Sequence, residues 1–293
     1  MGRHLLGPHV VGQRIVVRRL LDDGERGPSG GPALTDVLGV CVGWGEGLCR
    51  VRREDGTEVS VPLSRIVSGK PVPPRASVRH RVSAREAQLA ALAMWPTLET
   101  AELGGWTLRW SDASTARRAN SVLALGPAGV SDPVTRVLEH YAALGRRPIA
   151  AVLPDSAEDE LFRSRGWVRE SHESDSLFQI AGVAAARRGL GDRPAYAVRL
   201  EVEGDHATAR VGEDAQGLAS YSRDWLGLRG VGVRPERRRR GLALAVVGSL
   251  LDWGAERGAT TAYLQVLADN APALALYDRL GFTTHHAYRY LAC

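Results

Sequence analysis

Several features that define other protein classes are missing from this chain of 293 residues. No apolar run approaches the ~18–20 residues that a membrane-spanning helix needs. Residues 1–10 lack the apolar core of a secretory signal peptide. The three cysteines, Cys41, Cys49 and Cys293, have no Cys-x-x-Cys spacing, which argues against a disulfide framework and against a zinc site. We therefore expect a cytoplasmic protein without a metal centre.

Lysine is almost absent as well. Lys70 is the only lysine among 38 basic residues, and the formal net charge is +5. Arginine suits phosphate groups because its guanidinium is planar and permanently charged. A codon preference in a GC-rich genome would explain the overall excess equally well. The local run Arg237–Arg240 is different: alone it fits a nucleic-acid patch, but its position between a predicted strand and a predicted helix favours a small phosphorylated ligand.

The length and the composition, with 44% hydrophobic and 24% charged residues, are those of a globular protein with two or three domains. Residues 1–70 contain short β-branched runs separated by Gly- and Asp-rich connections. Their size and spacing resemble an SH3-like β-barrel. Such barrels bind peptides, bind nucleic acids or pack against a neighbouring domain, and we favour packing or an oligomer contact. Residues 71–84 then form a Pro-rich linker.

Beyond the linker, the stretches 85–190 and 195–293 each alternate strands with helices. This order predicts an α/β fold, a mixed sheet flanked by helices. The first stretch has predicted strands at 106–110, 121–125, 149–153 and 167–179 and helices at 84–95, 133–144 and 158–165. The second has a strand ending at 233, strands at 262–267 and 283–290 and helices at 242–257 and 272–280.

The two stretches match each other. Placed without gaps, Asp155 falls on Asn270, Phe162 on Tyr277 and Gly166 on Gly281. This correspondence predicts an internal duplication. The first copy has Gly126–Gly129 where the second has its arginine run, so it lacks the phosphate-binding features.

The arginine run has the layout of an anion site. A β-branched strand ends at Val233, Pro235 follows it, and Gly241 precedes an apolar periodic helix. The first amides of a helix have no partner inside the helix, and its dipole favours negative charge there. Gly241 has no Cβ and lets a phosphate approach the backbone.

Two motifs resemble those of the GNAT N-acetyltransferase superfamily. The first is Val233-x-Pro235-x-x-Arg238-x-x-Gly241-x-Ala243, which is similar to the family's acetyl-CoA pyrophosphate loop. The second is Asn270-x-Pro272-Ala273-x-x-x-Tyr277-x-x-x-Gly281-Phe282. The resemblance covers 195–293 well and 85–184 loosely, so we expect a degenerate GNAT-like half at 85–190 and an acetyl-CoA-binding GNAT domain at 195–293.

The resemblance implies acetyl-CoA as cosubstrate and no metal. It implies that Asn270 binds the pantetheine arm or fixes the helix entry, and that Tyr277 stands near the thioester sulfur as the general acid. It also implies that backbone N–H groups of the strand contact the thioester and the cofactor. The predicted cofactor-binding residues are Val231, Gly232, Val233, Arg238, Arg239, Arg240, Gly241, Leu242, Ala243, Asn270 and Ala273.

Simpler explanations stay open at these positions. Asn270 suffices as a helix N-cap and Tyr277 as a core aromatic. Trp95, Trp106 and Trp110 suit either an acceptor pocket or the core, and the Arg117–Ser121 run suits either an acidic substrate or a solvated turn. Glu201, Glu213, Asp224 or water are the candidates for the base. His285 and His286 would point to opposite faces of a strand, which disfavours a metal site.

We therefore predict an N-acetyltransferase that moves an acetyl group from acetyl-CoA to a primary amine of a small molecule, peptide or protein. The alternative is a non-catalytic acyl-CoA-binding regulator whose N-terminal barrel binds nucleic acid or a protein. The enzyme could form a homodimer. We expect neither a membrane nor a nucleic acid among its partners.

Overall fold

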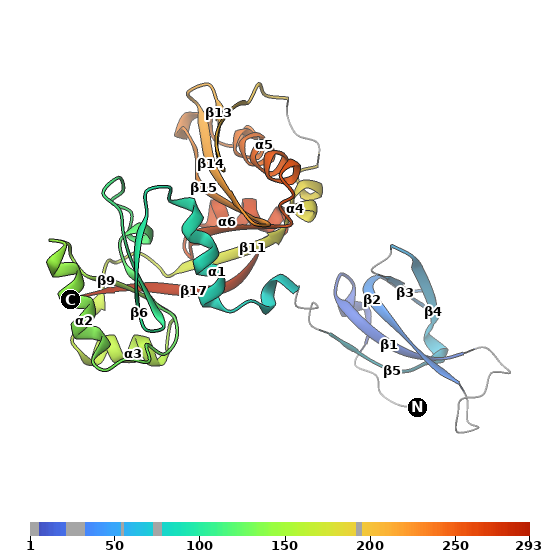
Figure 1. The fold of residues 1–293 in the computed structure, drawn as a ribbon. Helices are drawn as coiled ribbons and strands as arrows, with labels where there is room; N and C mark the ends of the chain where they lie inside the picture. The colour runs from blue at the N-terminus through green and yellow to red at the C-terminus, as the bar shows by residue number, and fades with distance from the viewer. Residues whose placement is uncertain (1–5, 22–32, 54–55, 73–77, 192–194) are drawn as a thin grey trace. The chain divides into compact units, whose positions relative to one another are not determined.

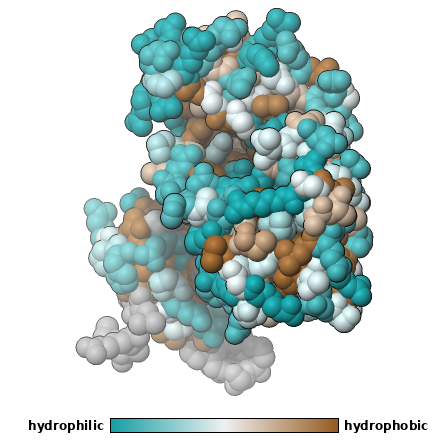
Figure 2. Space-filling view, turned by 90° about the vertical axis from the view of Figure 1, so that its left-hand side faces the viewer, coloured by the Kyte–Doolittle hydropathy of each residue, from teal (hydrophilic) through white to brown (hydrophobic). Residues whose placement is uncertain are grey.

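The computed structural model describes residues 6–21, 33–53, 56–72, 78–191 and 195–293. The chain forms two compact units, Met1–Ala76 and Ser77–Cys293 (Figure 1). No helix in these described ranges is long and apolar enough to cross a membrane. Hydrophilic side chains cover most of the face shown in Figure 2, and hydrophobic ones show there as separate patches. Residues 73–77 of the predicted linker lie outside the described residues.

The first unit is a five-stranded antiparallel sheet in the order β4-β3-β2-β1-β5. Buried and exposed side chains alternate along its strands, which gives one covered face. The expected SH3-like barrel is not closed: β4 pairs with β3, β5 pairs with β1, and no pairing among the described residues joins β4 to β5. The elements are η1 (Pro8–Val10), β1 (Arg14–Leu20), β2 (Leu34–Gly45), β3 (Leu48–Arg52), β4 (Glu58–Pro62), η2 (Leu63–Arg65) and β5 (Ile66–Pro71).

The second unit contains one sheet of twelve strands in the order β12-β13-β14-β15-β16-β11-β17-β9-β8-β7-β6, with β10 paired to β17. Its strands are β6 (Glu99–Leu103), β7 (Trp106–Trp110), β8 (Val122–Ala124), β9 (Ile149–Val152), β10 (Val168–Arg169), β11 (Ser176–Gly182), β12 (Arg199–Glu203), β13 (His206–Val211), β14 (Ala215–Ser222), β15 (Trp225–Val233), β16 (Thr261–Leu267) and β17 (Thr283–Ala292).

Helices cover this sheet. The α-helices are α1 (Ala84–Ala90), α2 (Pro133–Ala143), α3 (Ala157–Ser164), α4 (Val183–Gly189), α5 (Leu242–Glu256) and α6 (Ala271–Arg279), and the 3-10 turns are η3 (Val78–Arg81), η4 (Ala91–Met94), η5 (Arg117–Ala119) and η6 (Pro235–Arg237). A capping box of Ser83 and Glu86 starts α1. The predicted helix at 84–95 is split, because its last turn is the 3-10 turn η4.

The centre of the sheet is built by an exchange of strands. β11 follows the first set of elements, yet it lies between β16 and β17. β17 ends the second set and pairs with β9 of the first. The parallel pairs β8–β9 and β15–β16 stand on either side of these two strands. The sheet order therefore reads as two similar halves that have exchanged their last strands.

Corresponding helices of the two halves end in the same way. The Trp167 N–H donates to the Phe162 carbonyl at 3.1 Å, and the Phe282 N–H donates to the Tyr277 carbonyl at 3.0 Å. At the other end, the N-cap of α3 is Ser156, whereas that of α6 is Asn270. In the gapless match α6 therefore begins one residue earlier than α3, whereas the two helices end at the same position.

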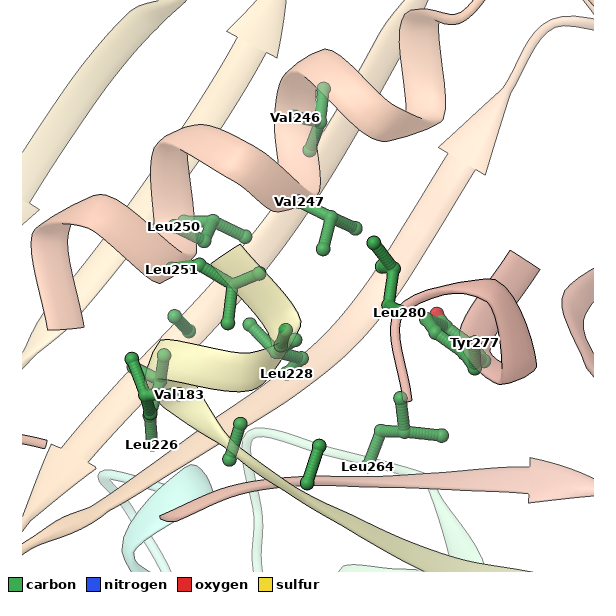
Figure 3. Packing of buried hydrophobic residues seen from close by; sticks show 14 of the residues in the cluster. Val183, Leu226, Leu228, Val246, Val247, Leu250, Leu251, Leu264, Tyr277 and Leu280 are labelled. Atoms are coloured by element: carbon green, nitrogen blue, oxygen red, sulfur yellow. The ribbon is translucent and has the colours of Figure 1, made fainter. Parts of the chain in front are cut away.

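The largest core lies between α5 and the sheet. Figure 1 shows α5 across the strands β13 to β15. Figure 3 shows side chains of α5, among them Val247 and Leu251, in one cluster with Leu226 and Leu228 of β15. Apolar residues at intervals of three and four give α5 this buried face. The core fixes the start of α5 against the end of β15, which is where the predicted site lies.

Candidate active site

A cavity of about 1080 Å³ opens between the end of β15, the start of α5 and α6. It is large enough for a cofactor-sized ligand. Every residue predicted for the site lines it: Val231, Gly232, Val233, Arg238, Arg239, Arg240, Gly241, Leu242, Ala243, Asn270, Ala273 and Tyr277. The structure thus brings together two motifs that are separate in the sequence, and their roles stay a prediction.

The cavity begins where two parallel strands part. β15 and β16 pair only from Trp225–Leu228 with Thr261–Leu264, and both strands then continue unpaired with each other. On its other side β15 carries a β-bulge, since Gly230 and Val231 together oppose Gly217 of β14. A bulge leaves its extra residue out of the ladder. On the side of the gap, β15 beyond Leu228 has no pairing with β16, so its backbone borders the space where a ligand could lie.

The loop after β15 places a helix N-terminus at the cavity. Arg239 and Gly241 have φ of 62° and 83°, and Gly241 is the N-cap of α5 without a side-chain cap. Within the described part of the chain, the N–H groups of Gly241, Leu242 and Ala243 donate to no protein acceptor. The open amides and the helix dipole both favour an anion here.

The arginines of this loop have different partners. Arg237 pairs with Asp214 at 3.0 Å, and the Arg238 Nε donates to the Val233 carbonyl at 3.4 Å. No carboxylate of the described residues lies within 4 Å of Arg238, Arg239 or Arg240, and all three are exposed. Three cations without an acidic partner around open amides make the cavity suited to a phosphate or pyrophosphate.

Asn270 closes the opposite wall. Its Oδ1 accepts from the Ala273 N–H at 3.3 Å, so it is the N-cap of α6. The N-cap role explains the residue without any ligand. It leaves the Asn270 Nδ2 group as a donor at the cavity wall.

Tyr277 lies on α6 at the edge of the core, next to Leu280 in Figure 3. Its side chain is 7% exposed, and its ring packs edge-on against Phe282 with centroids 5.6 Å apart. Burial raises the pKa of Tyr277 to about 12, so the hydroxyl keeps its proton at neutral pH. It has no hydrogen-bond partner among the described residues. Tyr277 can therefore donate a proton into the cavity it lines.

The candidate bases lie elsewhere. Glu201 is on the edge strand β12 and pairs with Arg199 at 3.0 Å, Glu213 is in the turn before β14, and Asp224 accepts from the Thr260 hydroxyl at 2.7 Å. None of the three lines the cavity, and the described lining residues include no carboxylate. Arg229 of β15 and Gln265 of β16, at the opening of the strand gap, were not among the residues predicted from the sequence. Their position follows only from the register of the two strands.

The equivalent of Tyr277 in the first half fills a core. Phe162 is fully buried between Trp106 and Trp167, with ring centroids 5.3 and 4.7 Å away. In place of the arginine loop stands Gly126–Gly129, without any cation. The first half therefore has neither the hydroxyl nor the arginines that line the cavity of the second half.

The expectation for the adjacent histidines is wrong. A β-bulge at His285 puts His285 and His286 on the same side, with their Nδ1 atoms 2.8 Å apart. The His285 Nε2 donates to the Val82 carbonyl at 2.9 Å, and the Gln88 amide donates to the His286 Nε2 at 3.1 Å. These partners require both rings to be neutral. Burial, and then the neighbouring His285, lowers the pKa of His286 to about 3.

Comparisons with known proteins find similarity to acetyltransferases. The family model described as "Probable histone acetyltransferase Rv0428c C-terminal" matches residues 195–291. The chain is 29% identical to the "Probable histone acetyltransferase Rv0428c" of Mycobacterium tuberculosis, over 96% of this chain and 95% of that protein. It is 36% identical to a mycothiol acetyltransferase of Clavibacter michiganensis, over 50% of this chain and 47% of that protein.

A solved structure shares the fold. The GCN5-related N-acetyltransferase from Kribbella flavida superposes on this protein with a TM-score of 0.53 at 16% sequence identity. The superposition covers 71% of this chain and 95% of the Kribbella chain. The chain thus has acetyltransferase homologues over most of its length, and it shares the fold of a GCN5-related N-acetyltransferase.

Proposed function

We propose that this protein is an N-acetyltransferase that moves an acetyl group from acetyl-CoA to a primary amine of a small molecule, peptide or protein. The observation that supports it is the single cavity in which the open amides of α5, three arginines and the Tyr277 hydroxyl meet. The pyrophosphate would bind at Arg238–Ala243. The pantetheine arm would then run along Val231–Val233 and past Asn270.

The chain's own groups suit acetyl transfer. The amine attacks the thioester carbon, and the developing oxyanion accepts a hydrogen bond from a backbone N–H of Val231–Val233. The carbon–sulfur bond then breaks, and Tyr277 donates its proton to the thiolate of CoA. Such an acid contributes roughly 10²- to 10⁴-fold to the rate. No carboxylate lines the cavity in the described residues, and water is the candidate that we propose for the proton of the amine.

We also propose one active site per chain. The region 85–190 would be a degenerate GNAT-like half, and 195–293 the acetyl-CoA-binding domain. In the first half, uncharged Gly126–Gly129 stands in place of the arginine loop, and Phe162, which has no hydroxyl, stands in place of Tyr277. Calorimetric titration should give one acetyl-CoA per chain. Two molecules per chain would show that the first half binds the cosubstrate too.

The relatives do not agree on an acceptor. Their names refer to histones, to mycothiol and to the alanine of a ribosomal protein. A primary amine is the group we take as common to these acceptors.

The test is release of CoA from acetyl-CoA in the presence of a panel of amines, with acetylated products identified by mass spectrometry. Amine-dependent release supports the enzyme. Tight binding of acetyl-CoA without turnover on any amine would favour a non-catalytic acyl-CoA-binding regulator instead.

A further inference from the structure

The strand gap has a second face, opposite α5. The last residues that β15 and β16 pair are Leu228 and Leu264, and both are buried in the core under α5. Side chains alternate along a strand. The next residues, Arg229 and Gln265, therefore lie on the opposite face, one on each side of the opening gap. A ligand that reaches the thioester from this face passes between them.

Arg229 is a cation without an acidic partner. Its guanidinium lies over the ring of Trp95, with 4.6 Å from Cζ to the centroid, and its Nε is buried without a hydrogen-bond partner. No carboxylate in the described ranges lies within 4 Å of it. Burial lowers the pKa of Arg229, although arginine stays charged at neutral pH. A half-buried charge of this kind is costly unless something neutralises it.

Gln265 leads to a second such cation. The Tyr288 hydroxyl donates to the Gln265 Oε1 and accepts from the Arg118 Nε at 2.9 Å. The amide orientation of Gln265 is thereby fixed, and its Nε2 group is left as a donor. Arg118 has no carboxylate within 4 Å among the residues described, because Glu173 pairs with its neighbour Arg117. Both sides of the gap thus present donors and positive charge.

We propose that the acceptor amine carries an anionic group, a carboxylate or a phosphate, and that Arg229 and Gln265 bind it. The inference rests on the proposed acetyl transfer at Val231. The guanidinium lies over the Trp95 ring and can offer its N–H groups to an anion, and Gln265 adds an amide donor. Arg118 is connected to Gln265 through the Tyr288 hydroxyl, and its charge adds to the positive potential on this side of the gap.

The same geometry limits the acceptor. Arg229 is two residues from Val231, about 7 Å along the strand, so we expect one small acceptor to reach both the Arg229 side chain and the thioester. Amine and anion therefore belong to one small molecule or to one terminal residue. A lysine-rich peptide would bring positive charge to a positive site, and like charges repel.

The experiment compares matched amines with and without an anionic group, together with a cationic peptide. Acetyl transfer is measured for glucosamine 6-phosphate against glucosamine, for leucine against leucinamide, and for a lysine-rich peptide. A charge-assisted contact is stronger than a neutral one, so we expect kcat/KM to be about 10- to 100-fold higher for the anionic member of at least one pair. The pair that responds distinguishes phosphate from carboxylate. Binding of the same compounds to the CoA-bound protein is measured by calorimetry, where the same preference is expected.

Arg229→Gln should remove the preference for the anionic amine. Arg229→Lys should keep part of that preference, because lysine keeps the charge but lacks the planar guanidinium. Arg136→Gln on α2 is the control, because it removes one exposed positive charge from the same unit. All three variants should keep the thermal shift caused by CoA.

Two outcomes would overturn the inference. One is equal transfer and equal binding within both pairs, and the other is a preference for the lysine-rich peptide. In either case intact CoA binding and turnover would leave the proposed function standing. Loss of CoA binding and turnover in the unmodified protein would instead refute the proposed function.

Discussion

The position that best tests the pyrophosphate site is Gly241, the N-cap of α5. We predict that Gly241→Val abolishes stabilisation by CoA, because a branched side chain would project where the phosphate approaches the open amides. The residue also has φ of 83°, so any side chain is strained there. A loss of stability alone would therefore not prove the point, and the variant needs a matched control.

Gly258 offers that control. It follows the same helix at its other end and has φ of 88°, with nothing closer than the Tyr221 hydroxyl, 4.0 Å from an added Cβ. The fifteen residues of α5 separate the two glycines by about 22 Å. Left-handed backbone costs a residue with a side chain roughly 1–2 kcal/mol. Both variants should then melt roughly 2–8 °C lower than the unmodified protein, at 2–4 °C per kcal/mol.

The difference appears when CoA is added. A ligand at 100 times its Kd stabilises the folded state by about 2.7 kcal/mol, which corresponds to a rise in Tm of about 5–11 °C. Differential scanning fluorimetry should show this rise in the unmodified protein and in Gly258→Val, and none in Gly241→Val. A full CoA-induced rise in Gly241→Val would refute the placement of the pyrophosphate.

Three further predictions concern buried side chains. Tyr277→Phe should lower kcat about 10²-fold with an unchanged CoA-induced Tm; since the pKa of Tyr277 is about 12, its ionisation should not lower the rate below about pH 10. Tyr141→Phe should lower the free energy of unfolding by about 1–3 kcal/mol in urea, because the Tyr141 hydroxyl bonds both the N–H and the carbonyl of Arg109; an unchanged value would contradict it. The folded pKa of His286, about 3, is below the ordinary value, so the stability it contributes is present above pH 6.5 and is lost as the pH falls. Between pH 7 and pH 5 the loss should reach about 2 kcal/mol and should shrink in His286→Asn, whereas equal losses would exclude His286 as the source.

The sequence was most informative where local chemistry sets an element's end. Pro235 and Gly241 place the end of β15 and the start of α5, and Asn270 places the start of α6. Each of these residues has a conformational reason that acts within one turn of the backbone. These residues fix the ends of the elements around the cavity, and the two motifs that contain them supplied part of its lining.

Long-range pairing left no such local signal. Nothing in the residues of β11 indicates that it lies between β16 and β17, and nothing in β5 indicates that its sheet stays open. The bulge at His285 depends on the register with β11 in the same way. Arg229 and Gln265 went unnoticed because their shared face follows from the register of β15 with β16.

The exchange of β11 and β17 also affects how the chain can fold during its synthesis. β9 is made long before β17, the strand that pairs with it, and until then one side of β9 is an open edge. An open edge is a site where another chain can add a strand. Closing so long a loop is slow because its entropy must be lost before the contacts form. The nascent chain therefore carries an aggregation-prone edge that the finished protein has covered.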